Sequence, residues 1–389
     1  MAGLAFQPEG AGYLNGQAVS SRISTGLVHD YLLVMRGGER TFAAIADCWP
    51  DASIYTLLYD DAGTDGRFHD RTVHTSYLQR LGIRQDGFRR LLPFFPRVAS
   101  HLPVQDHDLV VSSSSAFAHG VRPRPGAAHI CYCHSPFRYA WHERDRALEE
   151  APRLARPVLR GVLSRVRSWD ADAAQRVTHY VANSQITRER IQRVWGRDAE
   201  IVHPPVEVNR FEIGTPEDFF LVVMELVRHK RVELALEAAK RAGKPIKVVG
   251  TGPDYERLQA LHGDHAQFLG RVDDAGLTDL YSRALALIVP NVEEFGIAAV
   301  EAQAAGRPVV AVNAGGVRET VVDGSTGVLV PVDDVDAMAD ALRSTDFTRF
   351  APERIRQHAY GFSTEAFKHR FTTEVARLSA LEVPAAQAA

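Results

Sequence analysis

The sequence has few cysteines, no long apolar run and little imbalance of charge, and each absence excludes a class of protein. Its three cysteines, Cys48, Cys131 and Cys133, are too few and too unevenly spaced for a disulfide framework or a zinc site. No window approaches the roughly 18 apolar residues of a membrane-spanning helix, and the N-terminus lacks the basic start and apolar core of a secretory signal. We therefore expect a soluble cytoplasmic protein whose cysteines are small buried side chains.

Length and charge narrow the class further. The chain has 389 residues, 45% of them hydrophobic and 24% charged, which is typical of a globular protein of two or three domains. The formal net charge is −3. Because a nucleic-acid-binding protein is usually strongly basic, we expect no nucleic-acid partner.

Short apolar runs alternate with helix-like patterns along most of the chain. This alternation is typical of parallel sheets covered by helices on both faces. We predict an α/β fold with two Rossmann-like, doubly wound parallel-sheet domains that face each other across a cleft. The longest predicted helical segment is 137–175. The predicted strands are 23–28, 53–57, 108–112, 129–133, 177–182, 219–224, 245–249, 267–269, 285–289 and 308–312.

A proline-rich segment, His203-Pro204-Pro205, marks the domain boundary, because proline interrupts regular structure. We predict a flexible arm over 1–21, a first domain over 22–212 and a second domain over 213–356. A closing helix at about 357–380 should pack back on the first domain.

The strongest local signal is Glu293-Glu294 followed by a predicted helix that begins near Gly296. The backbone amides of Phe295, Gly296, Ile297 and Ala298 should point beyond the carboxyl ends of the strands, where a helix N-terminus binds phosphate. Glu293 and Glu301 lie about two turns apart, so they are placed to bind two hydroxyl-bearing rings on either side of a phosphate rather than to act on one bond. On this motif alone, Glu293 and Glu294 could equally be favourable charges at a helix start.

Other residues fit the same kind of site. Lys230 follows the predicted strand 219–224, and the chain has only five lysines against forty arginines, so lysine here favours a need for a compact positive charge. Gly37-Gly38, at a strand-to-helix turn, is a second candidate contact for a phosphate or sugar. Gly315-Gly316 offers a further close backbone approach.

Gly250-Thr251-Gly252 follows a strand and suggests a dinucleotide site. The third glycine of that motif would fall at Tyr255, so we do not favour a nicotinamide or flavin cofactor. The sequence has no Walker A loop, His-Glu-x-x-His helix or Gly-x-Ser-x-Gly elbow.

The segment from Glu293 to Glu301 resembles the E-x7-E signature of the family 4 retaining glycosyltransferases, which have the two-domain GT-B fold. The similarity extends over nearly the whole chain after residue 22, and the branch it resembles contains bacterial O-antigen and exopolysaccharide mannosyltransferases. The other matching segments are 29–31, 37–40, 131–139, 183–184, 203–206, 268–271 and 315–320.

This resemblance implies roles for the motif around Glu293. Glu293 would hold hydroxyls of the donor sugar, and Glu301 the ribose of its nucleotide. The amides of residues 295–298, together with Lys230, would hold the diphosphate.

It also implies roles for residues further along the cleft. Gly37 and Gly38 would lie against the diphosphate or the acceptor, and Gly270 and Arg271 would border the base. His134 would contact the donor sugar near its anomeric centre, although by position alone it is as readily a structural histidine.

One position departs from the pattern. Relatives of this branch usually have arginine where this chain has Glu225, and a carboxylate facing the diphosphate would repel it. We expect Glu225 to turn aside and pair with Arg228 or another cation, and Arg228 or Arg231 to take over the second phosphate contact.

The resemblance thus implies a transferase that moves a sugar, at first guess mannose from GDP-mannose, to a lipid-linked or saccharide acceptor in cell-surface polysaccharide synthesis. The donor would be a GDP- or UDP-sugar, with no metal and no other cofactor. The alternatives are a nucleotide-sugar epimerase of the same fold and a catalytically silent nucleotide-sugar-binding protein.

The segment from Arg153 to Arg167 contains five arginines and no acid, with apolar residues at helical spacing between them. Such a helix is either an ordinary amphipathic surface helix or a peripheral contact with anionic lipid at the inner face of the plasma membrane.

Overall fold

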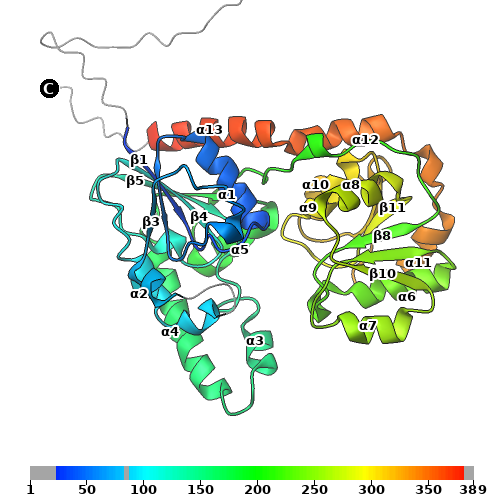
Figure 1. Ribbon diagram of the computed structural model, residues 1–389, viewed down its shortest axis with the longest axis horizontal. Coiled ribbons are helices and arrows are strands. Elements are labelled where there is room, and N and C mark those ends of the chain that lie inside the picture. Colours follow the sequence, from blue (N-terminus) through cyan, green and yellow to red (C-terminus); the bar gives the residue numbers. More distant parts are fainter. Residues whose placement is uncertain (1–22, 83–86, 381–389) are drawn as a thin grey trace, which may run out of the picture.

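The computed structural model describes residues 23–82 and 87–380. Two parallel sheets, each with helices packed against it, form two domains that face each other (Figure 1). This arrangement confirms the predicted α/β class with two Rossmann-like domains. The predicted N-terminal arm over 1–21 lies outside the described residues.

The first domain is built on a seven-stranded sheet with the order β3-β2-β1-β4-β5-β6-β7. Its central strands are buried along their whole length, because helices cover both faces and apolar runs such as 109–111 and 130–133 supply their residues. Its strands are β1 (Thr25–His29), β2 (Ser53–Thr56), β3 (Val73–Thr75), β4 (Leu109–Ser114), β5 (Ala128–Cys133), β6 (His179–Ala182) and β7 (Ala199–Ile201).

The helical segment predicted over 137–175 is interrupted. Helix α3 ends at Glu150 and α4 begins at Arg156, because Pro152 removes a backbone donor and disfavours helical geometry in the residue before it. Together the two helices project from the body of the first domain (Figure 1). The helices of this domain are α1 (Gly37–Cys48), α2 (Phe95–Ala99), α3 (Arg144–Glu150), α4 (Arg156–Ala174) and α5 (Gln185–Trp195).

The second domain has a six-stranded sheet with the order β10-β9-β8-β11-β12-β13. Its strands are β8 (Phe220–Val223), β9 (Ile246–Val249), β10 (Ala266–Gly270), β11 (Ala286–Val289), β12 (Val309–Val312) and β13 (Gly327–Val330). Its helices are α6 (Val232–Ala242), α7 (Tyr255–His262), α8 (Asp274–Arg283), α9 (Ile297–Ala304), α10 (Val317–Thr320) and α11 (Val335–Ser344).

The last two helices lead the chain from the second domain back to the first. Helix α12 (Pro352–Ala359) packs on α9, and α13 (Thr364–Ala380) runs along the first domain (Figure 1). Phe367 and Phe371 of α13 are buried edge-on against Tyr132 of β5, with ring centroids 5.7 and 5.6 Å away. Burial of each phenyl ring contributes about 1.5–3 kcal/mol, so α13 ties the end of the chain to the first core.

Among the described residues, no helix has the length and apolar character needed to cross a membrane.

Candidate active site

The predicted phosphate-binding turn lies after β11. Helix α9 begins at Ile297, and Gly296 precedes it with a φ of +92°, a left-handed conformation that favours glycine. The first amides of α9 have no carbonyl one turn earlier to bond, so they are available to a ligand. Val317 closes one side of Gly296, since a Cβ at this position would lie 3.1 Å from its Cγ1.

Lys230 and Glu293 form a bidentate ion pair beside this turn. Lys230 Nζ donates to both carboxylate oxygens of Glu293 at 2.8 Å, and Asn291 Nδ2 donates to Glu293 Oε1 at 2.9 Å. The Lys230 and Glu293 side chains are 23% and 18% exposed. The structure therefore brings together a cation, a carboxylate and a helix N-terminus, three groups that the sequence had assigned to one donor site.

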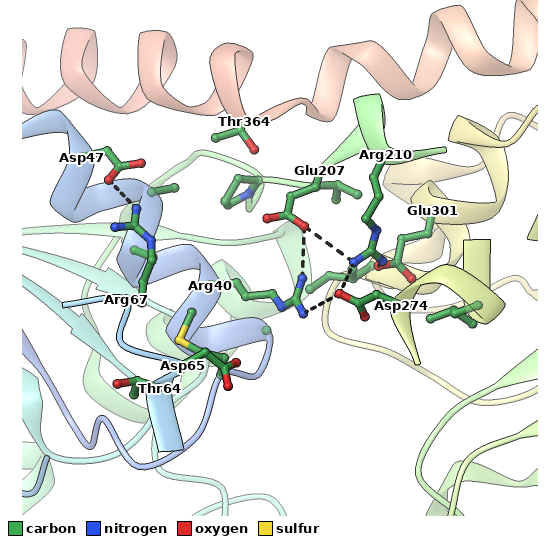
Figure 2. Close-up of a pocket in the computed structure, with 18 residues that line it drawn as sticks. Arg40, Asp47, Thr64, Asp65, Arg67, Glu207, Arg210, Asp274, Glu301 and Thr364 are labelled. Carbon is green, nitrogen blue, oxygen red and sulfur yellow. Dashed lines mark hydrogen bonds and ion pairs between the residues drawn. The ribbon is translucent and has the colours of Figure 1, made fainter. Parts of the chain in front are cut away.

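The carboxylate of Glu301 lies in a second part of the site. Tyr281 donates a hydrogen bond of 3.0 Å to Glu301 Oε2, and Arg210 Nη2 lies 3.7 Å from Oε1. Burial raises the pKa of Glu301 despite these partners. The carboxylate lines a pocket of about 480 Å³ between the domains (Figure 2).

The same pocket has an ion-pair network that joins the two domains. Arg40 of α1 reaches Glu207 at 3.1 Å and Asp274 of α8 at 3.6 Å, while Arg210 pairs with Asp274 at 2.9 Å (Figure 2). Of these four residues, the sequence analysis included only Arg40, in the segment 37–40. The others could not be identified from the sequence, because their pairing depends on how the domains meet.

Helix α1 faces α9 across the pocket. A Cβ on Gly37 would lie 3.1 Å from Ile297 Cδ1, and a Cβ on Gly38 would lie 4.0 Å from His134 Nε2. The two glycines form the first turn of α1, so the positive ends of both helices converge on one place. The absence of side chains on Gly37 and Gly38 lets Ile297 and His134 lie close to the first turn of α1.

His134 follows β5 and is held by the neighbouring strand. Its Nε2 lies 2.8 Å from Ser113 Oγ, which also lies 3.1 Å from Nδ1 of buried His29. Burial lowers the pKa of His134 to about 4, so the ring is neutral at physiological pH. A neutral ring can donate or accept one hydrogen bond without repelling a cationic sugar.

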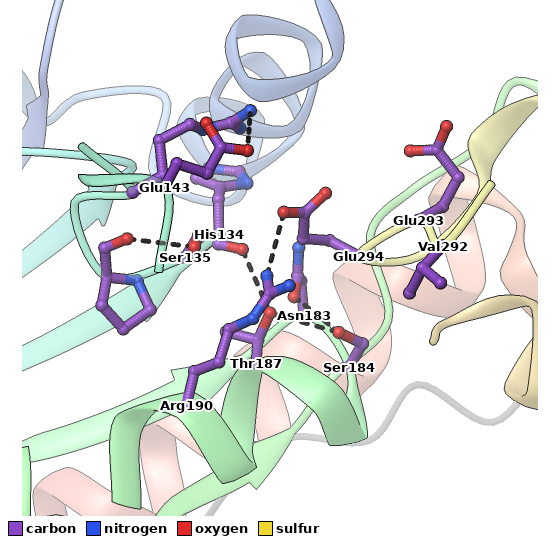
Figure 3. Close-up of polar contacts among 12 residues, drawn as sticks. His134, Ser135, Glu143, Asn183, Ser184, Thr187, Arg190, Val292, Glu293 and Glu294 are labelled. Atoms are coloured by element: carbon purple, nitrogen blue, oxygen red, sulfur yellow. Dashed lines mark hydrogen bonds and ion pairs between the residues drawn. The ribbon is translucent and has the colours of Figure 1, made fainter. Parts of the chain in front are cut away.

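Contacts between the domains also flank the site. Arg190 of α5 donates to Glu294 at 2.9 Å, whereas the side chain of the preceding residue, Glu293, points away from Arg190 (Figure 3). The amide of Gln185, the first residue of α5, donates to both carboxylate oxygens of Glu319 at 2.9 and 3.0 Å. Ser184 precedes α5, but its side chain makes no capping bond to the helix backbone, so the Glu319 carboxylate of the other domain caps the helix instead.

Two glycine pairs have a packing role. A Cβ on Gly250 would lie 1.9 Å from Met224 O, and one on Gly252 would lie 2.3 Å from Leu226 O, so these glycines let two loops touch. A Cβ on Gly315 would likewise lie 2.4 Å from Glu293 O. Gly315-Gly316 therefore supports the backbone that carries Glu293.

Several predicted contacts lie apart from this centre. Arg231 pairs with Asp333 at 2.5 Å, and both line a surface hollow that also contains Arg228 but not Lys230. Glu225 is exposed and makes no ion pair among the described residues, so its expected pairing with Arg228 does not form. A second phosphate contact by Arg228 or Arg231 stays a prediction, and it would require Arg231 to leave Asp333.

Gly270 ends the edge strand β10, and Arg271 follows it. Gly270 has a φ of +65°, and its carbonyl accepts a hydrogen bond of 2.8 Å from Gly250 N. Arg271 is exposed. Both remain candidates for contact with a base at this edge of the sheet.

Comparison with known proteins agrees with this geometry. The model of glycosyltransferase family 4 matches residues 35–210, and that of the glycosyl transferases group 1 matches residues 206–359. Phosphatidyl-myo-inositol mannosyltransferase of Mycobacterium leprae is 46% identical over 100 residues, which are 24% of this chain and 26% of the relative. D-inositol 3-phosphate glycosyltransferase of Kribbella flavida is 32% identical over 257 residues, 56% of this chain and 59% of the relative. Both matches thus span less than two thirds of the relative's own length.

Solved structures share the fold over most of the chain. Anabaena Alr3699/HepE, in complex with UDP-glucose, has a TM-score of 0.67 and 17% identity, and the match covers 91% of this chain and 99% of that one. Sucrose-phosphate synthase of Thermosynechococcus elongatus has a TM-score of 0.67 and 18% identity, with 92% and 100% covered. The two adjoining family matches and the GT-B fold together show that the chain belongs to glycosyltransferase family 4.

Proposed function

We propose that the protein transfers a glycosyl group from a nucleoside-diphosphate sugar to an acceptor hydroxyl, with retention at the anomeric carbon. The observation that carries this proposal is the Lys230–Glu293 pair at the N-terminus of α9, opposite the N-terminus of α1. In this proposal Glu293 would bind sugar hydroxyls, and Lys230 and the helix amides would bind the diphosphate. Glu301 would bind the ribose in the pocket beyond.

In the proposed reaction, the bond between the anomeric carbon and the β-phosphate oxygen breaks as the acceptor oxygen bonds to the same carbon. Negative charge grows on the departing diphosphate, and Lys230 and the two helix N-termini stabilise it from fixed positions. The departing phosphate oxygen accepts the acceptor's proton, so the transfer balances without a carboxylate nucleophile. Because protein groups supply the positive field, we propose that no metal is required.

The donor is proposed to be GDP-mannose. Several relatives are named mannosyltransferases, which supports mannose as the sugar, and the Anabaena structure, which contains UDP-glucose, supports a nucleoside-diphosphate donor. The acceptor is proposed to be a lipid-linked or saccharide compound of cell-surface polysaccharide synthesis.

Donor turnover tests this function. Purified protein would be incubated with GDP-mannose, UDP-glucose or ADP-glucose, with and without a cell-envelope lipid extract, and the products followed by NMR of the anomeric proton. We expect a product with retained configuration that depends on the extract. Conversion of the donor sugar without acceptor would indicate an epimerase, and binding of a nucleoside diphosphate without turnover would indicate a silent binding protein.

We also propose that the α3–α4 projection attaches peripherally to an anionic membrane. Leu154 and Val158 near its tip are 96% and 71% exposed, and Arg153, Arg156 and Arg160 lie among them. Each basic residue near an anionic surface contributes about 1 kcal/mol. Sedimentation with phosphatidylglycerol vesicles at low salt should therefore decrease when these three arginines are replaced by glutamine, and unchanged sedimentation would refute the attachment.

A further inference from the structure

The carboxyl ends of three neighbouring strands place a row of polar side chains behind His134. His29 ends β1 and is the register partner of Ser113 in β4. Ser113 is in turn the register partner of Tyr132 in β5, two residues before His134. Because side chains alternate between the two faces of a sheet, this register directs His29, Ser113 and His134 to the same face. We call these three residues the His–Ser–His chain.

One hydroxyl group joins the two imidazole rings of this chain. Ser113 Oγ lies 2.8 Å from His134 Nε2 and 3.1 Å from His29 Nδ1. Ser113 and His29 are buried, whereas His134 is half-buried. The second ring nitrogen of His134, Nδ1, has no hydrogen-bond partner among the described residues. Nδ1 is therefore the ring nitrogen of His134 that remains available to a substrate.

The backbone of His134 is fixed independently of its ring. Its amide donates to the carbonyl of Ser114 at 2.9 Å, and its own carbonyl accepts a hydrogen bond of 3.2 Å from Thr187 Oγ1 of α5 (Figure 3). The main chain is thus held by a strand on one side and a helix on the other. What remains to be set is the orientation of the ring and the nitrogen that carries its proton.

Helix α1 packs against both rings. The ring of His29 stacks on Phe42, with ring centroids 4.7 Å apart. Gly38 lies one turn before Phe42 on the same side of the helix, and a Cβ on Gly38 would lie 4.0 Å from His134 Nε2. The His–Ser–His chain therefore lies between the sheet and the helix whose N-terminus faces the candidate donor site.

The single proton of the Ser113 hydroxyl decides the tautomers. Burial lowers the pKa of His29 to about 3, with a smaller effect of His134, and burial lowers that of His134 to about 4. Both rings are then neutral at physiological pH, and each carries one proton on one nitrogen. Ser113 donates to one ring and accepts from the other, so the two tautomers are linked.

The surroundings of His29 favour one of the two arrangements. Its Nε2 has no hydrogen-bond partner among the described residues. A proton on Nε2 would leave a buried N–H without an acceptor, which is rarer in proteins than an unpaired lone pair. His29 therefore carries its proton on Nδ1 and donates to Ser113. Ser113 then donates to His134 Nε2, which leaves the proton of His134 on Nδ1.

We propose that Ser113 and His29 are positioning residues, which orient His134 with its proton on Nδ1 so that it donates a hydrogen bond to an oxygen of the donor sugar. This inference rests on the proposed transferase function and adds two residues that do not touch the substrate. It also makes His134 a donor rather than an acceptor in the site.

NMR of the full chain labelled with ¹⁵N-histidine tests the tautomer without any substrate. Long-range proton–nitrogen correlations distinguish a protonated ring nitrogen from an unprotonated one, and the signals of His134 are those lost in His134→Gln. We expect wild type to carry the proton of His134 on Nδ1. In Ser113→Ala, signals of the tautomer protonated on Nε2 should appear, because nothing then donates to that nitrogen.

Ser112 supplies a matched control for the kinetic test. It precedes Ser113 in β4, is equally buried and lies 2.8 Å from His129 Nε2, but it points to the other face of the sheet. Each alanine variant thus removes one buried hydroxyl beside a histidine. With the donor that wild type turns over, Ser113→Ala should lower kcat by about 10-fold and change KM less, whereas Ser112→Ala should keep kcat near that of wild type.

Two variants of His29 test the direction of the hydrogen bonds. His29→Asn keeps an N–H donor near Ser113 and should retain the tautomer of His134 and most of kcat. His29→Leu fills a similar volume without a donor, so it should mix the tautomers and lower kcat as Ser113→Ala does. Thermal unfolding of all variants separates a loss of fold from a loss of positioning.

Two results would overturn the inference. The first is a proton on Nε2 of His134 in wild type, and the second is an equal fall of kcat in Ser112→Ala and Ser113→Ala. The absence of turnover with any donor would instead contradict the proposed function, and the NMR measurement would still decide whether Ser113 and His29 set the tautomer of His134.

Discussion

The Lys230–Glu293 pair places opposite charges where a donor is expected to need both. Each group is mostly buried, so neither can be removed without leaving the other with an unpaired charge. A diphosphate would offer Lys230 a new partner, and sugar hydroxyls would offer one to Glu293. The pair therefore holds both side chains in place before the ligand arrives.

The first prediction concerns this lysine. Lys230→Ala should weaken binding of a nucleoside diphosphate by about 10–100-fold, because one or two charge-assisted contacts are lost. Calorimetry with GDP and UDP, without added metal, measures the effect. Lys240 is exposed on α6 and has no ion pair in the described structure, so Lys240→Ala is the matched control. Equal affinities in wild type and Lys230→Ala would remove Lys230 from the site.

The two glutamates of the motif should differ in kinetic effect. Glu301→Gln disturbs a contact to the ribose that is the same in the ground and transition states, so KM should rise more than kcat falls. Glu293→Gln disturbs the sugar whose charge changes during reaction, so kcat should fall strongly. Initial-rate kinetics with varied donor would distinguish them, and the opposite pattern would exchange the two roles.

At the scale of elements, three consecutive serines of β4 each contact a histidine. Ser112 bonds His129, Ser113 bonds His29 and His134, and Ser114 lies 3.3 Å from His119. The sequence did not predict this row, because the histidines come from β1, β5 and the turns after β4 and β5. Burial keeps them neutral and couples the stability of the first domain to pH.

His129 allows this coupling to be measured. Burial lowers its pKa to about 3 from the ordinary histidine value of 6.5, so between pH 3 and pH 6.5 the unfolded chain binds a proton that the native chain does not. Because of His129, the free energy of unfolding therefore falls as the pH drops below 6.5, by up to about 1.4 kcal/mol per pH unit. Asp170 has its pKa raised to about 7 by burial and acts in the opposite direction.

Accordingly, His129→Gln should flatten the fall in the free energy of unfolding between pH 6.5 and pH 4, while retaining a partner for Ser112. Urea unfolding at several pH values measures the slope. His369 is exposed on α13, and His369→Gln should leave the slope as in wild type. A slope that is identical in all three proteins would show that His129 is not buried in its neutral form.

The sequence predicted elements more completely than contacts between them. The apolar run at 109–111, within the predicted strand 108–112, predicted β4, and Glu293-Glu294 followed by Gly296 predicted the start of α9. In contrast, β3 and β7 have only three residues each, too few to show a period. The contacts of Arg190 and Glu319 could not be assigned, because their partners lie more than a hundred residues away, in the other domain.

At the scale of the whole molecule, Glu319 of α10 joins the second domain to the first. It accepts two hydrogen bonds from Gln185 N at the start of α5, and His203 Nε2 lies 2.8 Å from Oε2. The His203 ring in turn stacks on Phe295 of the candidate site, with ring centroids 5.4 Å apart. A carboxylate at a helix N-terminus is stabilised by the helix dipole as well as by the hydrogen bonds.

Glu319→Ala should therefore loosen the two domains without unfolding either. Loss of charge-assisted bonds worth about 1.5–3 kcal/mol should shift the ratio of closed to open arrangements by roughly 10-fold or more. Small-angle X-ray scattering should show a larger radius of gyration, and sugar transfer should fall. Affinity for a nucleoside diphosphate should change little, because Lys230 and α9 belong to one domain. Glu353 of α12 is exposed and has no ion pair among the described residues, so Glu353→Ala serves as the control. An unchanged radius together with unchanged transfer would show that Glu319 does not hold the domains together.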